Sequence, residues 1–185
     1  STVFFFYAIS IISLAQALTL AFVSPIIVTI LSIFYLKEKV GIHRWSAVII
    51  GFIGVLIIIR PGFLEINFAS ISAIGAGTAY AFYIIYTRKL SFIDSPVVTL
   101  LFTGLVGCIL ISLILPYYWT NIDLRQLLLL ILLASIGALA HFLIILSLRI
   151  GEASKLAPLG YFEISTNILV GYMFFGDLPD IWIYL

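Results

Sequence analysis

Apolar runs about as long as a membrane is thick alternate with short polar segments along the whole chain. The hydrocarbon core of a bilayer is about 30 Å thick, and a helix needs about 20 apolar residues to cross it. The pattern predicts six complete spans and two spans cut by the ends of the chain. These runs cover residues 2–16, 20–36, 45–59, 69–87, 96–115, 126–148, 156–175 and 178 onward.

The runs have the pattern of helices and not that of barrel strands. A strand of a membrane barrel alternates lipid-facing and lumen-facing residues over about ten positions. The stretch "VVTLLFTGLVGCILISLIL" at 97–115 shows no such alternation. The polar segments also contain Ser-Pro at 95–96, where serine can cap a helix and proline can occupy its first turn. The sequence therefore predicts an all-α, polytopic membrane helix bundle.

The positive charges of the predicted loops indicate how the chain is oriented. One set of alternate loops holds seven basic residues, namely Lys37, Lys39, Arg44, Arg88, Lys89, Arg149 and Lys155. The other set holds two, Arg60 and Arg125. Because cytoplasmic loops carry the excess of Lys and Arg, the loops at 37–44, 88–95 and 149–155 are predicted to be cytoplasmic.

Composition agrees with a membrane protein and excludes several functions. The chain has 185 residues, of which 64% are hydrophobic and 9% charged, whereas soluble domains are about a quarter charged. A net charge of +1 without a basic patch argues against a nucleic-acid partner. The single cysteine, Cys108, lies in an apolar run, which excludes a disulfide framework and a cysteine-based metal site within this sequence. We expect no cofactor and no bound metal.

A weak internal echo predicts an inverted repeat. Residues 6–17 align with 142–153, and residues 34–38 align with 173–177 after a slip of three positions. The loop charges give the two copies opposite directions across the membrane, which is a common plan of secondary transporters. The chain also begins and ends inside apolar runs, so we expect it to be an internal fragment.

Two stretches carry a family resemblance. "ALTLAFVSPIIVTILSIFYLKEKVGIHRWSAVIIGFIGVLIIIRPG" (17–62) contains an early proline, Pro25, then an acid, Glu38, a short basic loop and a glycine-rich helix that ends at Arg-Pro-Gly. "GEASKLAPLGYFEISTNILVGYMFFGDLPD" (151–180) continues the pattern, with Asp177 in place of the usual glutamate. The chain resembles EamA-type transporters of the drug/metabolite transporter superfamily. Within that superfamily it is most similar to the bacterial S-adenosylmethionine uptake carriers.

The resemblance implies a fold of ten helices in two five-helix repeats. This chain would then cover about eight of the ten helices and would lack the first two. Residues 1–68 would be the C-terminal part of the first EamA repeat, with three helices. Residues 69–185 would be the second repeat, with five helices of which the last is truncated.

Glu163 is the first candidate functional residue. A charged acid near the centre of a bilayer costs about 2.5–3.5 kcal/mol, so it usually faces a cavity or finds a partner. Glu163 follows the predicted cytoplasmic start of its helix by seven to eight residues, which places it about 10–12 Å deep. Helical spacing puts Asn167 on the same face. We predict a substrate-binding or proton-coupling role, and an acid hydrogen-bonded to a neighbouring helix is the alternative.

His141 is expected at a similar depth on the preceding helix. A Glu163–His141 pair could relay a proton or hold a cationic group, although a histidine hydrogen-bonded to a backbone carbonyl is equally consistent with the sequence. Neither residue has an ionisable counterpart in the first repeat, which favours a site in the second. Further candidates for the site are Ser24 and the aromatic residues Tyr80, Tyr83 and Tyr161, whose rings would suit a cationic metabolite or would simply pack.

The favoured function is a secondary transporter, not an enzyme, that moves a small polar or cationic metabolite by alternating access. Amino acids, nucleosides and compounds like S-adenosylmethionine are the substrates considered. A structural or assembly subunit is the alternative, and an intramembrane enzyme is disfavoured because no His-Glu-x-x-His motif or paired acids occur. The bacterial inner membrane is the expected location, the lipid bilayer and the metabolite are the expected partners, and a homodimer stays open.

Overall fold

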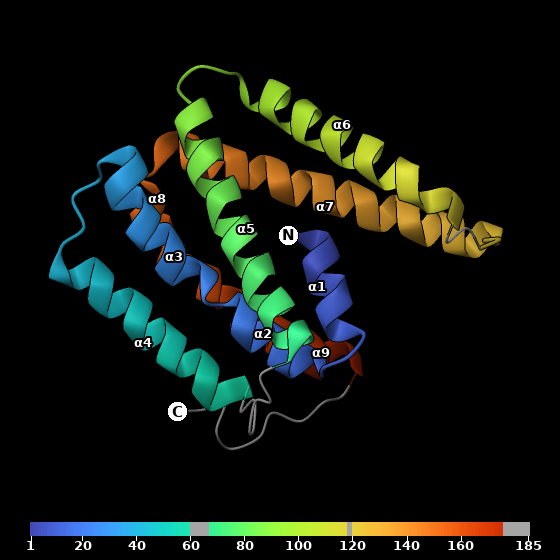
Figure 1. Ribbon diagram of the computed structural model, residues 1–185, viewed down its shortest axis with the longest axis horizontal. Helices are drawn as coiled ribbons and strands as arrows, with labels where there is room; N and C mark the ends of the chain where they lie inside the picture. The colour runs from blue at the N-terminus through green and yellow to red at the C-terminus, as the bar shows by residue number, and fades with distance from the viewer. Residues whose placement is uncertain (60–66, 118–119, 176–185) are drawn as a thin grey trace. The chain divides into compact units, whose positions relative to one another are not determined.

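The computed structural model describes residues 1–59, 67–117 and 120–175 (Figure 1). Every regular element in these ranges is a helix, which confirms the predicted all-α class. In chain order the elements are α1 (Thr2–Ile9), α2 (Leu14–Ala21), α3 (Ser24–Leu31), the π-helix η1 (Ser32–Leu36), α4 (Ile42–Ile59), α5 (Phe68–Leu90), α6 (Pro96–Ile114), the 3₁₀-helix η2 (Leu115–Tyr117), α7 (Leu124–Ile150), α8 (Ala153–Leu156), the 3₁₀-helix η3 (Ala157–Tyr161) and α9 (Phe162–Phe175).

Within the described residues, four helical segments are long and apolar enough to cross a membrane. They are Gln16–Tyr35, Phe68–Leu90, Pro96–Leu113 and Leu124–Ile150, and the shorter α4 is also apolar. Only 11% of the third and 6% of the fourth is buried within the chain. Soluble proteins rarely expose apolar surface on this scale, so these helices need lipid or further helices around them. The chain is a multi-pass membrane protein.

The described residues form two compact units. Unit 1 consists of Ser1–Tyr86 and the segment that begins at Glu152, and unit 2 consists of Thr87–Gly151. The cut falls inside α5. These units follow from contacts, whereas the predicted boundary at residues 68 and 69 follows from the family resemblance, so the division into repeats stays a prediction.

In unit 1 the second apolar run is a broken helix. Pro25 lies in the first turn of α3, and it has no N–H to donate to the carbonyl of Ala21. The chain therefore leaves α2 at Ala21 and enters α3 at Ser24. The Ala21 carbonyl oxygen faces α5 at Gly77, where a Cβ would lie only 2.5 Å from it. Glycine at position 77 thus allows the backbones of α2 and α5 to approach.

The corresponding run of the predicted second repeat is broken as well. Pro158 lies in the first turn of η3, and the chain passes from α8 through this 3₁₀-helix into α9. The two breaks adjoin, because a Cβ at Gly160 would lie 3.9 Å from Cγ of Pro25. An apolar cluster forms nearby from Phe22, Val55, Tyr161 and Ile164.

The expected position of the first loop is wrong. The first loop was expected near residues 17–19, yet the break between α1 and α2 spans Ser10–Ser13. Ser13 caps α2 by accepting from the Gln16 N–H, and the Gln16 side chain accepts from the Ser13 N–H. This capping box determines where α2 begins. The last predicted span and Asp177 lie outside the described residues.

In unit 2, α6 and α7 are antiparallel neighbours (Figure 1). Ser95 caps α6 ahead of Pro96, as the Ser-Pro pair predicts. Asp123 and Gln126 form a second capping box at the start of α7. Arg88 Nη1 donates to the carbonyl oxygens of Leu148 and Arg149 and so satisfies acceptors in the last turn of α7.

Contacts inside each unit join segments that are predicted to lie at the same surface, and the orientation itself stays a prediction. In unit 1 the carboxylate of Glu38, from one predicted cytoplasmic loop, accepts from the Ala153 N–H, from another. In unit 2, Arg88 bonds the end of α7 beside the loop at 149–155.

Candidate functional site

The helix break at Pro158 lies between Glu163 and the cytoplasmic start of its predicted span. Glu163 lies in the first turn of α9, after the four residues of α8 and the five of η3. A 3₁₀-helix rises about 2.0 Å per residue, against about 1.5 Å in an α-helix. Summed along the chain, these rises put Glu163 no more than about 18 Å from the start of α8, against a hydrocarbon core of about 30 Å.

Glu163 is exposed in the isolated chain. Its carboxylate interacts electrostatically with the hydroxyl of Tyr80 on α5. Tyr80 in turn interacts with Tyr83, and the centroids of the two half-buried rings are 5.9 Å apart with an interplanar angle of 30°. The structure thus brings three of the predicted site residues together. We call Glu163, Tyr80 and Tyr83 the acidic aromatic site.

Tyr161 has a packing environment. Its side chain is buried in the cluster with Phe22, Val55 and Ile164, and its hydroxyl donates to the Phe22 carbonyl oxygen over 3.5 Å. That carbonyl lies at the break between α2 and α3, so the Tyr161 side chain hydrogen-bonds to a backbone group at this break. A role of Tyr161 in substrate binding stays a prediction.

The remaining predicted residues are Ser24, Asn167 and His141. Ser24 is buried beside Pro25 at the start of α3. Asn167 lies on α9, but its side chain is outside the described residues. His141 lies on α7 in unit 2, whereas Glu163 belongs to unit 1. The predicted Glu163–His141 pair therefore stays a prediction.

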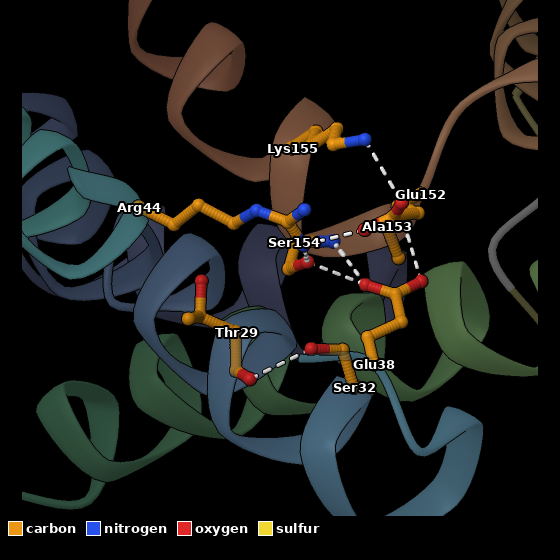
Figure 2. A network of polar contacts seen from close by, with 8 residues as sticks. All are labelled: Thr29, Ser32, Glu38, Arg44, Glu152, Ala153, Ser154 and Lys155. Atoms are coloured by element: carbon orange, nitrogen blue, oxygen red, sulfur yellow. Dashed lines mark hydrogen bonds and ion pairs between the residues drawn. The ribbon is translucent and has the colours of Figure 1, made fainter. Parts of the chain in front are cut away.

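A second polar group, which the sequence did not single out, lies at the predicted cytoplasmic side (Figure 2). The Glu38 carboxylate accepts from the backbone N–H groups of Ala153 and Ser154, each over 2.9 Å, and from the Ser154 hydroxyl. The partner of Glu38 is the start of α8, 115 residues further along the chain.

Arg44 completes this group. Its Nη1 donates to the Ser154 hydroxyl oxygen over 2.6 Å and lies 2.5 Å from Oε2 of Glu152. The Ser154 hydroxyl therefore donates to Glu38 while it accepts from Arg44. We call Glu38, Arg44, Glu152 and Ser154 the cytoplasmic network.

Glu152 is the solvent-facing member of the network. Hydrogen bonds from Lys155 and then from Arg44 lower the pKa of its carboxyl from the ordinary value of 4.5. The Lys155 ammonium lies 2.8 Å from Oε1 of Glu152. Both partners stabilise the charged form, so Glu152 is anionic at neutral pH.

Strained backbone holds Glu38 in place. The π-helix η1 ends at Leu36 and is followed by Lys37, whose φ of 55° and ψ of 31° lie in the left-handed region. This conformation costs a residue other than glycine about 1–3 kcal/mol. The Ser32 carbonyl accepts from the N–H groups of both Lys37 and Glu38. The turn directs the Glu38 side chain towards α8 (Figure 2), and a π-helix is itself often found at functional sites.

Comparison with known proteins confirms the resemblance. Residues 1–60 match the profile of the EamA-like transporter family. An S-adenosylmethionine uptake transporter of Rickettsia bellii is 28% identical over 174 residues, which cover 94% of this chain and 60% of the relative. A riboflavin transporter of Vibrio cholerae is 36% identical over 167 residues, which cover 89% of this chain and 55% of the relative.

A riboflavin transporter of Rhizobium johnstonii is 26% identical over 171 residues, which cover 92% of this chain and 57% of the relative. The chain thus spans somewhat more than half the length of these relatives. No solved structure matches it significantly. The EamA-type resemblance is supported, and the relatives are named for two different substrates.

Proposed function

We propose that the full-length protein is a secondary transporter that moves a small cationic metabolite across the bacterial inner membrane by alternating access. The EamA-type sequence and the multi-pass helices support a carrier. The two adjoining helix breaks also support it, because discontinuous helices line the substrate sites of many transporters. In this proposal the two repeats move relative to each other around a site near the middle of the membrane.

The observation that carries the proposal is the electrostatic interaction of Glu163 with Tyr80. A carboxylate at this depth is costly unless it meets water, a cation or a polar group. The adjacent tyrosine rings offer faces that attract cations, and their hydroxyls can donate hydrogen bonds to a polar substrate. Glu163 would bind the positive charge of the substrate or carry a coupling proton.

The charge of this site favours one kind of substrate. S-adenosylmethionine, in the name of the Rickettsia bellii relative, is a cation that contains a heteroaromatic ring. Riboflavin, in the name of the Vibrio cholerae relative, is neutral at physiological pH. A carboxylate that interacts with Tyr80, whose ring packs near that of Tyr83, complements a cationic group attached to a ring. We therefore favour a substrate like S-adenosylmethionine over riboflavin.

An uptake assay tests this proposal. The full-length protein in proteoliposomes is given radiolabelled S-adenosylmethionine, adenosine or riboflavin, and wild type is compared with Glu163→Gln and Tyr80→Ala. Asp94→Asn is the matched control, because it also removes one carboxylate but lies in a loop of unit 2 outside the spans. We expect Glu163→Gln to reduce uptake of the cation at least about tenfold, as loss of a desolvated charge partner would.

The proposed role of Glu163 is wrong if Glu163→Gln transports at the wild-type rate with the same pH dependence. Equal loss of uptake in Asp94→Asn would show that the assay reports general damage to the protein. Absence of uptake of all three compounds by well-folded wild type would favour a structural subunit.

A further inference from the structure

The cytoplasmic network joins segments that belong to different predicted repeats. Glu38 and Arg44 follow α3 in the first repeat, whereas Glu152 and Ser154 precede and begin α8 in the second. All four residues belong to unit 1. They also lie in the segments 37–44 and 149–155, which are both predicted to be cytoplasmic. The network therefore connects the two repeats at one surface of the membrane.

The bonds of Glu38 depend on a single relative position of the two segments. One carboxylate accepts from three donors, and all three belong to Ala153 or Ser154. Arg44 contacts the same segment through Ser154 and Glu152. If the segments moved apart by a few ångströms, these charge-assisted bonds would be lost together, because hydrogen bonds tolerate only a narrow range of distances.

The network is also mechanically linked to the acidic aromatic site. Ser154 lies in α8, which continues through η3 directly into the first turn of α9 at Glu163. A displacement of α8 therefore displaces the helix that carries Glu163. On the other side, the strained turn at Lys37 fixes Glu38 to the end of η1.

We propose, on the basis of the transport function proposed above, that the cytoplasmic network holds the cytoplasmic end of the substrate pathway closed and breaks when that end opens. The network is formed in this structure, which therefore shows the closed arrangement of unit 1 at that surface. Water can replace its bonds on opening, since Glu38 and Arg44 are only partly buried. Opening then replaces the hydrogen bonds of the network with hydrogen bonds to water, and closure reverses this exchange.

Thiol labelling of the full-length protein tests this inference without any substrate. Ser32 is fully buried beside Glu38 and is the reporter position, as Ser32→Cys (Figure 2). Cys108, which is exposed, and any other native cysteines of the full-length protein are replaced by serine. A membrane-impermeant thiol reagent is added to the cytoplasmic side of inside-out vesicles. The rate of labelling reports how often the cytoplasmic end opens.

The comparison uses two variants that weaken the network and one matched control. Glu38→Gln removes the charge that receives three hydrogen bonds, and Ser154→Ala removes the hydroxyl that joins Glu38 to Arg44. Lys39→Gln also changes the charge of this loop by one unit, but its exposed side chain lies outside the network. We expect labelling to increase about tenfold in the first two variants, the equilibrium effect of losing one charge-assisted bond, and to stay at the wild-type rate in Lys39→Gln.

A second reporter separates opening from unfolding. Val55→Cys lies in the apolar cluster near the other end of α4 and is 1% exposed. If Glu38→Gln increases labelling at position 32 but not at position 55, the network closes the cytoplasmic end as proposed. If Glu38→Gln labels at the wild-type rate at position 32, or labels equally faster at both positions, the inference is wrong.

This result is distinguishable from failure of the proposed function. Labelling of Ser32→Cys requires no transported substrate, so it is unaffected by the outcome of the Glu163→Gln uptake assay. Conversely, the two experiments can give opposite answers: Glu163→Gln reduces uptake as expected, but Glu38→Gln leaves the labelling rate unchanged. That outcome would leave the transport proposal intact and remove only the closing role of the network.

Discussion

Gly51 on α4 lies against the ring of Tyr161, so that a Cβ at position 51 would approach the ring Cδ2 atom to 2.2 Å. The ring is buried, and its hydroxyl reaches the carbonyl oxygen of Phe22 at the break between α2 and α3. Tyr161 therefore contacts three helical segments of unit 1 at once. The absence of a side chain at position 51 is what allows it to do so.

Gly51→Ala is expected to destabilise the protein by about 1–3 kcal/mol, as overpacking of a filled core does. The buried ring cannot move aside without losing its contacts with Phe22 and Val55. The measurement is denaturant unfolding of the purified protein in detergent. Gly54→Ala is the control on the same helix, where a Cβ would meet nothing within 4 Å, and helix propensity predicts a gain of up to about 1 kcal/mol there. The explanation fails if Tyr161→Leu costs as much in the Gly51→Ala background as in wild type.

Gly77→Ala is expected to be more damaging than Gly51→Ala. The added Cβ would lie 2.5 Å from the backbone carbonyl oxygen of Ala21, and backbone cannot rotate out of the way as a side chain can. We expect α2 and α5 to separate and the melting temperature in detergent to fall by more than in Gly51→Ala. Gly75→Ala is the control, since its nearest neighbour would be Cδ2 of the Phe4 ring at 4.0 Å. Similar melting temperatures for both α5 variants would contradict this account.

Lys37→Gly is expected to stabilise the protein by about 1 kcal/mol, because glycine adopts a left-handed conformation without steric cost. The same change at Lys39 removes an equal charge at a residue without a positive φ. There it should be neutral or destabilising, since glycine adds entropy to the unfolded chain. Thermal unfolding of the two variants compares them directly. A loss of stability in Lys37→Gly would mean that the lysine side chain matters more than its backbone strain.

Stability should depend on acid pH through Glu152. Its pKa in the folded protein is below the ordinary value of 4.5. The contribution of its ion pairs is therefore fully present above about pH 4.5 and is lost as pH falls through the folded pKa. The melting temperature of wild type should fall more between pH 6 and pH 3.5 than that of Glu152→Gln. Parallel pH profiles for the two proteins would show that these ion pairs do not contribute to stability.

Much of the fold follows from the sequence because membrane helices satisfy their own backbone polar groups. Apolar run length alone therefore gives the positions of α5, α6 and α7 to within a few residues. The predicted loop at residues 17–19 failed for a local reason. Run length ignores caps, and the capping box of Ser13 and Gln16 begins α2 inside an apolar region. The pattern Ser-x-x-Gln is present in the sequence and identifies this start.

The acidic aromatic site was only partly accessible from sequence. Glu163 was recognised because a carboxylate in an apolar run is rare, but its depth depends on the 3₁₀ geometry of η3, which run length does not reveal. The proximity of Tyr80 to Glu163 depends on how α5 packs within unit 1. The cytoplasmic network was missed for a similar reason, because Glu38 and Ser154 are 116 residues apart in the chain and no local pattern joins them.

Arg88 illustrates how closely insertion and folding are connected in this chain. It is one of the basic residues by which the orientation of the helices was predicted, and it also binds carbonyl groups at the end of α7 and stacks 4.5 Å above the ring of Phe92. Engineering that relocates positive charge to flip the insertion of the protein would remove these bonds as well. A flipped variant that misfolds would therefore report the lost helix cap as much as the altered orientation.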